Sequence, residues 1–527
     1  MSPARELSDA LGQLVEAELI FCDGKMPDAR YRFKHALVRD AAYESLLKTS
    51  RRSLHLRLLD ILETGGSTAP EILAHHAQEG GDTRKAVSYW QQAAEAASRR
   101  YAHREAAALY AAALEVADGL APEARASMLE ACAWENLVSD EVTVSVTRYE
   151  QALELWKALG RVLDQGRVLS RLSRSYGFRC RGEECHRVCH EAVALLQAYP
   201  DSREYLEALC ELARVEMSAE HFLMAIEAGS RALALAEQRG DERLIAQLLI
   251  NIGTARHGLG EIANGKALLE RSLAIARKNR DQDAIGRYYV LMSVLLYEQR
   301  RYKECEQLSL ECAKEFPVGE DAEVYYWLGT TWQAPSFFEQ GRWDEAESLA
   351  RRTLARQTLS GTLWFRPLPL VVIARLKAIR GTGNPEVELR EATELAASSL
   401  NPSRIVPAAI ARCEAGWLAA EGLGKTLIEI RSVYDWLKDF GRQRYLDELG
   451  YWLWCHGVEV EGIDPASARG LQIAGRWREA ADVWRSFGCP LEEGQALLGG
   501  DRQAVAQARE IFARLGAAAY LAKVSAS

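Results

Sequence analysis

Apolar residues recur every three or four positions along most of this chain, which is the pattern of amphipathic helices. Over residues 4–19, for example, Leu7, Leu11 and Leu14 share one face of a predicted helix. From about residue 70 onward, similar segments alternate with short turns that contain Gly or Asp. This pattern predicts an all-α protein built from pairs of helices.

The first 65 residues differ from this pattern in one place. Two short stretches of alternating polarity flank Asp23-Gly24, a pair that is typical of a β-hairpin. We therefore expect β structure near residues 20–33, followed by two helices and a joint at Gly65-Gly66-Ser67. Helix, hairpin and helices together predict that residues 1–65 form the end of a winged-helix domain.

Residues 66–460 contain an internal repeat of 40 residues. Leu233-Ala234-Leu235-Ala236 recurs as Leu273-Ala274-Ile275-Ala276. Aspartates recur at the same interval, in positions suited to cap the first helix of each pair: Asp201, Asp241, Asp281 and Asp321. A period of this length predicts stacked two-helix units, each burying the apolar face of its neighbour. The shorter helical segments in residues 461–527 are expected to cap the stack.

The small residues of one repeat, Asn251-Ile252-Gly253 followed by Gly260 and Ala267, resemble a 40-residue form of the tetratricopeptide repeat. The resemblance implies an α-α superhelix whose first helices line a concave groove. It also implies that Asn251 holds a peptide backbone in that groove. Leu291 replaces Asn in the next repeat, which weakens a full peptide clamp.

A second resemblance rests on residues 31–47, which read YRFKHALVRDAAYESLL, and on the nearby stretches 51–55 and 73–76. These are similar to the end of the ATPase module in large signal-transducing ATPase regulators. Stretches around Trp477 and Phe512 are similar to the region before the helix-turn-helix of the LuxR-type, MalT-like members. Residues 31–47 fit the class III adenylate and guanylate cyclases with an ATPase module at least as well, so both parents stay open. Neither an ATPase core nor a helix-turn-helix is expected in these residues. It therefore also stays open whether the chain is a fragment or a naturally reduced protein.

The same resemblance implies a role for His35. In related ATPases a winged-helix histidine near this place touches the β-phosphate of bound ADP. Without an ATPase core His35 has no nucleotide to sense, and a structural histidine at the end of the hairpin is an equal alternative.

Aromatic residues are dense between residues 325 and 365. Pro335 lies inside an expected first helix of this region and should kink it. A gap lined by aromatic rings predicts a ligand pocket, with Arg366 as a partner for an anion, whereas the alternative is that each ring is core. The predicted ligand- or partner-binding residues are Asn251, Tyr325, Tyr326, Trp327, Trp332, Trp364 and Arg366.

Two other motifs do not support a site. Cys180, Cys185, His186, Cys189 and His190 have a spacing that could hold zinc on one helix, but no second cysteine pair follows, so buried thiols are preferred. Residues 421–426, EGLGKT, resemble the end of a phosphate loop, yet Ala419 stands where the loop needs Gly. No catalytic residue, metal site or cofactor is predicted.

Composition narrows the function further. Acidic residues outnumber basic ones by 74 to 65, a net charge of −9, which argues against a stand-alone nucleic-acid binder. No apolar run is long enough to span a membrane, and no signal peptide is visible, so with eleven scattered cysteines we expect a cytoplasmic protein. The sequence predicts a non-enzymatic sensor and interaction module that binds a protein or peptide partner, a small effector, or both, in its groove. A plain scaffold for protein assembly is the alternative.

Overall fold

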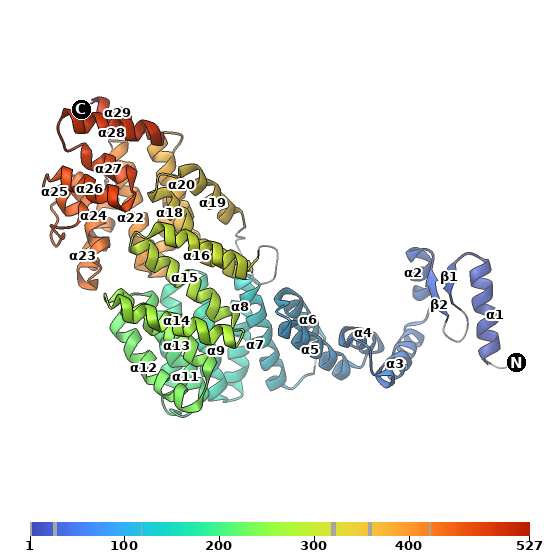
Figure 1. The fold of residues 1–527 in the computed structure, drawn as a ribbon. Helices are drawn as coiled ribbons and strands as arrows, with labels where there is room; N and C mark the ends of the chain where they lie inside the picture. The colour runs from blue at the N-terminus through green and yellow to red at the C-terminus, as the bar shows by residue number, and fades with distance from the viewer. Residues whose placement is uncertain are drawn as a thin grey trace. The chain divides into compact units, whose positions relative to one another are not determined.

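The computed structural model describes residues 3–24, 29–116, 119–317, 323–356, 361–420 and 423–526, and helices make up most of them (Figure 1). The predicted all-α superhelix with an N-terminal hairpin is confirmed. The chain divides into two compact units, residues 1–99 with 108–121 and residues 100–107 with 122–527. Among the described helices, none is both long and apolar enough to cross a membrane.

The first unit contains the hairpin. Strands β1 (Ile20–Asp23) and β2 (Arg30–Phe33) pair antiparallel, with Ile20 opposite Phe33. Gly24 follows β1 with a positive φ of 94°, as the predicted Asp-Gly turn requires, while Lys25 lies outside the described residues. The helices of this unit are α1 (Pro3–Glu16), α2 (Ala36–Glu44), α3 (Lys48–Gly65), α4 (Pro70–Gly80) and α5 (Thr83–Arg99), and α6 (His103–Glu115) lies across the division of the two units.

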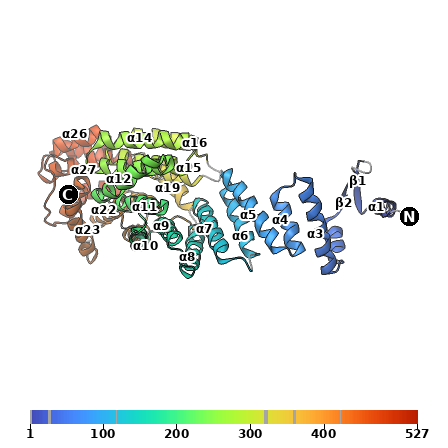
Figure 2. The same ribbon diagram turned by 90° about the horizontal axis from the view of Figure 1, so that it is seen from below.

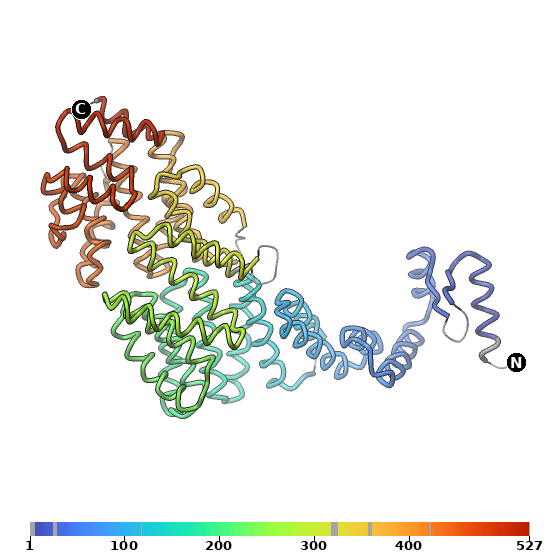
Figure 3. Tube along the Cα trace, in the orientation of Figure 1, coloured from blue at the N-terminus to red at the C-terminus, as the bar shows by residue number. Residues whose placement is uncertain are grey.

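The second unit begins with five antiparallel helix pairs linked by tight turns (Figure 3). The pairs are α7 (Pro122–Val138) with α8 (Val142–Ala158), α9 (Val162–Phe178) with α10 (Gly182–Leu196), α11 (Arg203–Ser218) with α12 (Phe222–Arg239), α13 (Glu242–Gly258) with α14 (Ile262–Lys278), and α15 (Gln282–Glu298) with α16 (Tyr302–Glu315). The first helices α9, α11, α13 and α15 follow one another side by side, and Figure 2 shows α9 next to α11. Nearly every residue of α13 from Leu244 to Ala255 is buried, because both of its faces meet a neighbouring helix.

Glycine lets the two helices of a pair approach closely. A Cβ atom on Gly265 in α14 would lie 2.6 Å from the carbonyl oxygen of Gly253 in α13. A separation under 3 Å between a methyl group and a backbone oxygen is a steric clash, so any larger residue at position 265 would push the helices apart. This contact gives a physical reason for the small residues of the repeat.

The predicted aspartate caps are correct at two of the three described positions. The side chains of Asp241 and Asp281 accept hydrogen bonds from the first-turn N–H groups of Leu244 and Ala284. The prediction for Asp201 is wrong, because Ser202 occupies the cap of α11 and leaves Asp201 outside the helix. Asp321 lies outside the described residues.

The helix that contains Pro335 is broken, not merely kinked. Helix α17 (Glu323–Thr330) ends before Thr331 and Trp332, and α18 (Gln333–Glu339) begins after them. Pro335 has no N–H to bond to the carbonyl four residues earlier, which is a sufficient cause for the break. The stack continues through α19 (Trp343–Arg356), α20 (Pro367–Arg380), α21 (Glu386–Ser399), α22 (Pro402–Leu418), α23 (Thr426–Phe440) and α24 (Gln443–Cys455).

The last helices pack on the later pairs. One buried core joins Trp343 and Ala350 of α19 to Trp484, Phe512 and Tyr520 near the C-terminus. These final helices are α25 (Ala468–Ile473), α26 (Trp477–Phe487), α27 (Pro490–Leu497), α28 (Arg502–Leu515) and α29 (Ala518–Ala526). They correspond to the shorter segments expected in residues 461–527.

Segments far apart in the sequence close the second unit on itself. The N–H of Thr362 donates to Asp140 at 2.8 Å, and Arg179 donates to the carbonyl of Gly361 at 2.7 Å. On another side, Arg442 at the start of α24 forms ion pairs with Glu220 at 2.9 Å and Glu298 at 2.5 Å. These contacts join early helices of the second unit to late ones, so the stack of helix pairs closes on itself.

Candidate functional site

A charged groove runs along the first helices of the second unit. It encloses about 590 Å³ and is lined from α7, α9, α11, α13 and α15 by seven arginines and four glutamates. The arginines are Arg167, Arg171, Arg174, Arg203, Arg214, Arg243 and Arg287. Six of these arginines form ion pairs with carboxylates, so the charge of the groove is largely compensated, and the exception among the described residues is Arg287.

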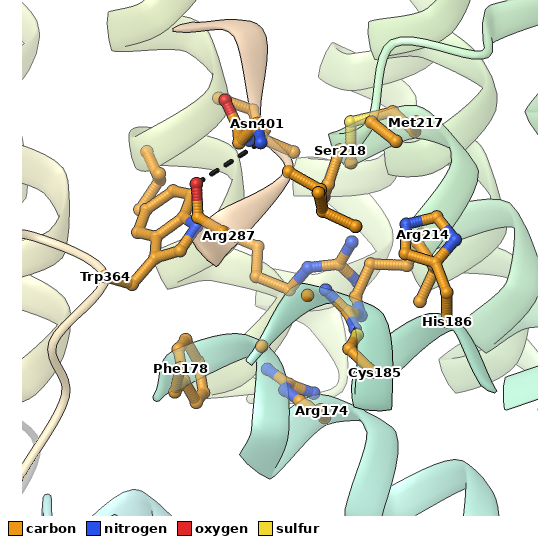
Figure 4. A pocket seen from close by; sticks show the side chains of 18 of the residues that line it. Arg174, Phe178, Cys185, His186, Arg214, Met217, Ser218, Arg287, Trp364 and Asn401 are labelled. Atoms are coloured by element: carbon orange, nitrogen blue, oxygen red, sulfur yellow. Dashed lines mark hydrogen bonds between the residues drawn. The ribbon is translucent and has the colours of Figure 1, made fainter. Parts of the chain in front are cut away.

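A smaller cavity of about 110 Å³ adjoins the groove. Aliphatic and aromatic side chains line it, including Phe178, Val290, Leu328 and Trp364. Figure 4 shows Phe178 and Trp364 on one side of this cavity and Cys185 and His186 on the other. Arg174, Arg214 and Arg287 line both spaces, so the cations stand where the polar groove meets the apolar cavity.

Two of the three arginines have carboxylate partners. Arg174 donates to Asp283 at 2.9 Å, and Arg214 donates to Glu211 at 2.8 Å. Burial disfavours the charge on Asp283, but Arg174 outweighs it and lowers the pKa of that carboxyl to about 2. Tyr325 completes this group by donating to Asp283 at 3.2 Å.

Arg287 is different, because among the described residues no carboxylate lies within 4.0 Å of it. Its guanidinium donates to the side-chain oxygen of Asn251 at 2.5 Å, and Asp283 is held by Arg174 instead. Burial, followed by repulsion from Arg174, lowers the pKa of Arg287. Among the described residues, Arg287 thus lines the cavity without a close ion pair, and its attraction to Asp283 acts over a longer distance.

Trp364 is fixed by a fully buried arginine. Arg404 is 1% exposed and stacks on the Trp364 ring at 3.3 Å from its centre, while the backbone N–H of Trp364 donates to the carbonyl of Phe178 at 3.1 Å. Burial lowers the pKa of Arg404 to about 9. One of its nitrogens has no hydrogen-bond partner among the described residues. The guanidinium of Arg404 therefore holds the Trp364 ring in place at the cavity.

The structure brings three of the predicted binding residues to this site. Tyr325 and Trp364 line the cavity. Asn251 is fully buried and bridges two helices, since it donates to the carbonyl of Cys210 at 3.0 Å while accepting from Arg287. Its role in this structure is to position Arg287.

The other predicted residues lie elsewhere. Trp332 is fully buried in the core, 4.9 Å from the Tyr297 ring. Arg366 is paired with Glu391 at 2.7 Å. Tyr326 and Trp327 are half-buried on α17, their rings meet edge to face, and neither lines the cavity.

His35 belongs to the first unit. It is exposed at the start of α2, where its side chain makes no capping hydrogen bond. Its role in sensing a nucleotide remains a prediction.

The cysteines near residue 185 behave as small buried residues. Cys180, Cys185 and Cys189 are at most 5% exposed, and burial raises the pKa of each thiol. All eleven cysteines of the chain are free thiols. The phosphate-loop likeness falls between helices α22 and α23, where residues 421 and 422 lie outside the described part.

The three arginines escaped the sequence analysis, although one signal was present. Arg174 and Arg214 are 40 residues apart, so they occupy equivalent positions on consecutive first helices. Arg287 is out of that register and shows no such signal. Its importance comes from its surroundings.

No protein-family model matches the chain, and no protein of curated function matches its sequence. Solved structures similar to it include aspartyl phosphate phosphatase F from Bacillus subtilis (12% identity, TM-score 0.42, covering 62% of this chain and 88% of that one). A Rap protein complexed with Competence and Sporulation Factor has 12% identity and a TM-score of 0.40, covering 67% of this chain and 99% of that one. A signal transduction ATPase with a tetratricopeptide repeat sensor from Pyrococcus horikoshii has 16% identity and a TM-score of 0.37, covering 74% of this chain and 58% of that one. Likenesses this distant carry no information on function.

Proposed function

We propose that this chain is a non-enzymatic sensor and interaction module that binds an anionic effector with an apolar part. The observation that carries the proposal is Arg287, a half-buried cation with no carboxylate within 4.0 Å among the described residues. A buried charge without a counter-charge costs stability. A carboxylate or phosphate on a ligand supplies that counter-charge and accepts charge-assisted hydrogen bonds.

The cavity determines the rest of the ligand. Phe178, Tyr325 and Trp364 offer ring faces, and the volume of about 110 Å³ limits the apolar part to about one ring or one side chain. The adjoining groove accepts a longer ligand, because the same arginines line both spaces. A free small carboxylate and the C-terminal residue of a peptide share this chemistry.

Binding here has a means of affecting the whole second unit. The cavity is lined by residues of α9, α11 and α15 and also by Trp364 and Asn401, which belong to the segments that close the unit. A ligand that fits the closed form better shifts the population toward it, by the ratio of its affinities for the two forms. The packing of the repeats therefore changes when the effector binds.

The parent protein that best fits this sensor is a cytoplasmic LuxR-type, MalT-like signal-transducing ATPase that regulates transcription. Support comes from the sequence around residues 31–47 and from the stacked helix pairs. The class III cyclase with an ATPase module is the second candidate, and a plain scaffold is the third. The neighbouring reading frames distinguish them: an upstream ATPase with a downstream helix-turn-helix supports the first, and an upstream cyclase domain supports the second.

Benzoate and benzamide are suitable probes of the cavity, since they share a ring and differ in charge. We expect benzoate at millimolar concentration, but not benzamide, to raise the melting temperature of the full chain. Arg287→Gln should abolish this effect, because it removes the charge and keeps a donor for Asn251. Arg243→Gln is the matched control, as Arg243 lines the groove but not the cavity. Equal stabilisation of the Arg287 variant by benzoate would contradict the proposal, as would a failure of small carboxylates and phosphates generally to stabilise the wild type.

A further inference from the structure

Helix α10 presents its cysteines and its histidines to different surroundings. Cys185 and Cys189 are buried in the core, whereas the side chain of His186 is 24% exposed and that of His190 is 52% exposed. The two histidines are four residues apart and so share one face of the helix. A pair of imidazoles at this spacing is a common half of a transition-metal site.

The other half is on α11. Glu216 is 2% exposed, and its carboxylate lies 3.1 Å from Nε2 of His190 and 3.9 Å from Nδ1 of His186. On its far side the second carboxylate oxygen is 2.7 Å from Nδ1 of His221, the residue that precedes α12. Among the described residues, no lysine or arginine nitrogen lies within 4.0 Å of this carboxylate. A buried carboxylate surrounded by imidazoles favours a cation.

We propose that His186, His190 and Glu216 bind a divalent transition metal ion of the zinc class, with His221 as the positioning residue for Glu216. One ligand atom from each of the three residues lies within 4.8 Å of the other two. Tetrahedral zinc with bonds of 2.0–2.1 Å needs separations of about 3.3 Å, a contraction that side-chain rotation provides. A ligating carboxylate is held in its orientation by a hydrogen bond from outside the ligand set, and His221, the third histidine here, provides it for Glu216.

Chemistry favours zinc, cobalt or nickel over calcium or magnesium. Two imidazole nitrogens suit borderline ions, whereas the hard cations prefer all-oxygen sites. Three protein ligands leave a coordination position for water. His186 also borders the cavity, although the metal site does not depend on an effector binding there.

A second histidine group has to be kept apart in any test. His55, His75 and His76 of the first unit also lie within 4.8 Å of one another, and two of their nitrogens are already 2.8 Å apart in a mutual hydrogen bond. This group includes no carboxylate, and it serves here as an internal reference. Its contribution to bound metal is the same in wild type and in variants of residues 186, 190 and 216.

The experiment uses the full chain, stripped with chelator and equilibrated with Zn²⁺ at neutral pH, with bound zinc counted by mass spectrometry of the eluted metal. We expect His186→Gln/His190→Gln to bind one Zn²⁺ per chain fewer than the wild type. His35→Gln, an exposed histidine outside both groups, should bind as much as the wild type. An unchanged count in the double variant would overturn the proposal.

Two further measurements distinguish the loss of a metal ligand from misfolding of the variant. Glu216→Gln has nearly the same shape and should also lose one Zn²⁺, while circular dichroism should show an unchanged helical content. With Co²⁺ as the probe, the wild type should show visible absorption bands of a four-coordinate ion that the Glu216 variant lacks. If Glu216→Gln keeps both the zinc and the bands, Glu216 is not a metal ligand, and the proposed site is overturned.

Discussion

Trp332 and Trp364 have different roles because their rings lie in different surroundings. Trp332 is fully buried beside Tyr297, whereas Trp364 is half-buried and lines the cavity. We predict that Trp332→Ala lowers the free energy of unfolding by about 3–5 kcal/mol, the usual result of emptying a core site of this size.

Trp364→Ala is the matched comparison, since it removes the same atoms from a partly exposed place. It should reduce stability clearly less than Trp332→Ala, and it should weaken the binding of benzoate. Urea unfolding of both variants, beside the thermal shift with benzoate, measures this. Equal stability losses, with binding lost only in the Trp332 variant, would reverse the two roles.

The residue scale is also where the sequence predicted least. Aromatic density led to Tyr325 and Trp364, which line the cavity, but it could not separate them from Trp332, which lies in the break between α17 and α18 and is buried in the core. Arg287 could not be found at all. An arginine indicates an anion site when the nearby carboxylates are paired with other cations. Only the folded structure shows which carboxylate pairs with which cation.

At the scale of single elements, the sequence predicted far more. The 40-residue period predicted the helix pairs, because several boundaries have a local signal in a cap, a turn glycine or a proline. The failed cap at Asp201 shows the limit of this logic: Ser202 is an equally good cap one residue later, and the spacing alone could not choose between them.

These caps give a prediction of their own. Asp241→Ala should cost about 1 kcal/mol of stability, because it removes the acceptor for the N–H of Leu244 at the start of α13. Asp201→Ala is the control and should change stability by less than about 0.5 kcal/mol, since Ser202 still caps α11. Urea denaturation followed by circular dichroism distinguishes the two, and a larger loss for the Asp201 variant would show that the caps are misassigned.

At the scale of the whole second unit, closure could not be predicted from the repeat. A plain solenoid has contacts only between neighbouring repeats, so its stability is a sum of local terms. Here Arg442 lies 2.9 Å from Glu220, more than 200 residues earlier in the chain. Which distant repeats meet depends on small rotations accumulated over many helix pairs, and no local motif encodes that sum.

We predict that Arg442→Gln destabilises the closed unit by about 3 kcal/mol, because it leaves the carboxylate of Glu298 without its cation. Glu220 adds less to this loss at neutral pH, because burial raises its pKa to about 8 and so keeps it mostly protonated. Hydrogen exchange should therefore accelerate both near residue 220 and near residue 442. Arg476→Gln, which breaks the exposed pair with Glu479, is the control and should leave exchange unchanged. Acceleration confined to α24 in the Arg442 variant would argue against closure.

Closure also has a consequence for the making of the protein. The residues that line the cavity extend from Arg174 to Asn401, so a ribosome has to deliver all of α9 to α21 before the walls meet. Earlier helix pairs fold as they emerge, because their contacts are local. The arginines are thus hydrated and separated while the chain is growing, and they become a desolvated cluster only in the final assembly step. The proposed anionic effector would therefore bind only after that last step, and it would stabilise completed chains but not truncated ones.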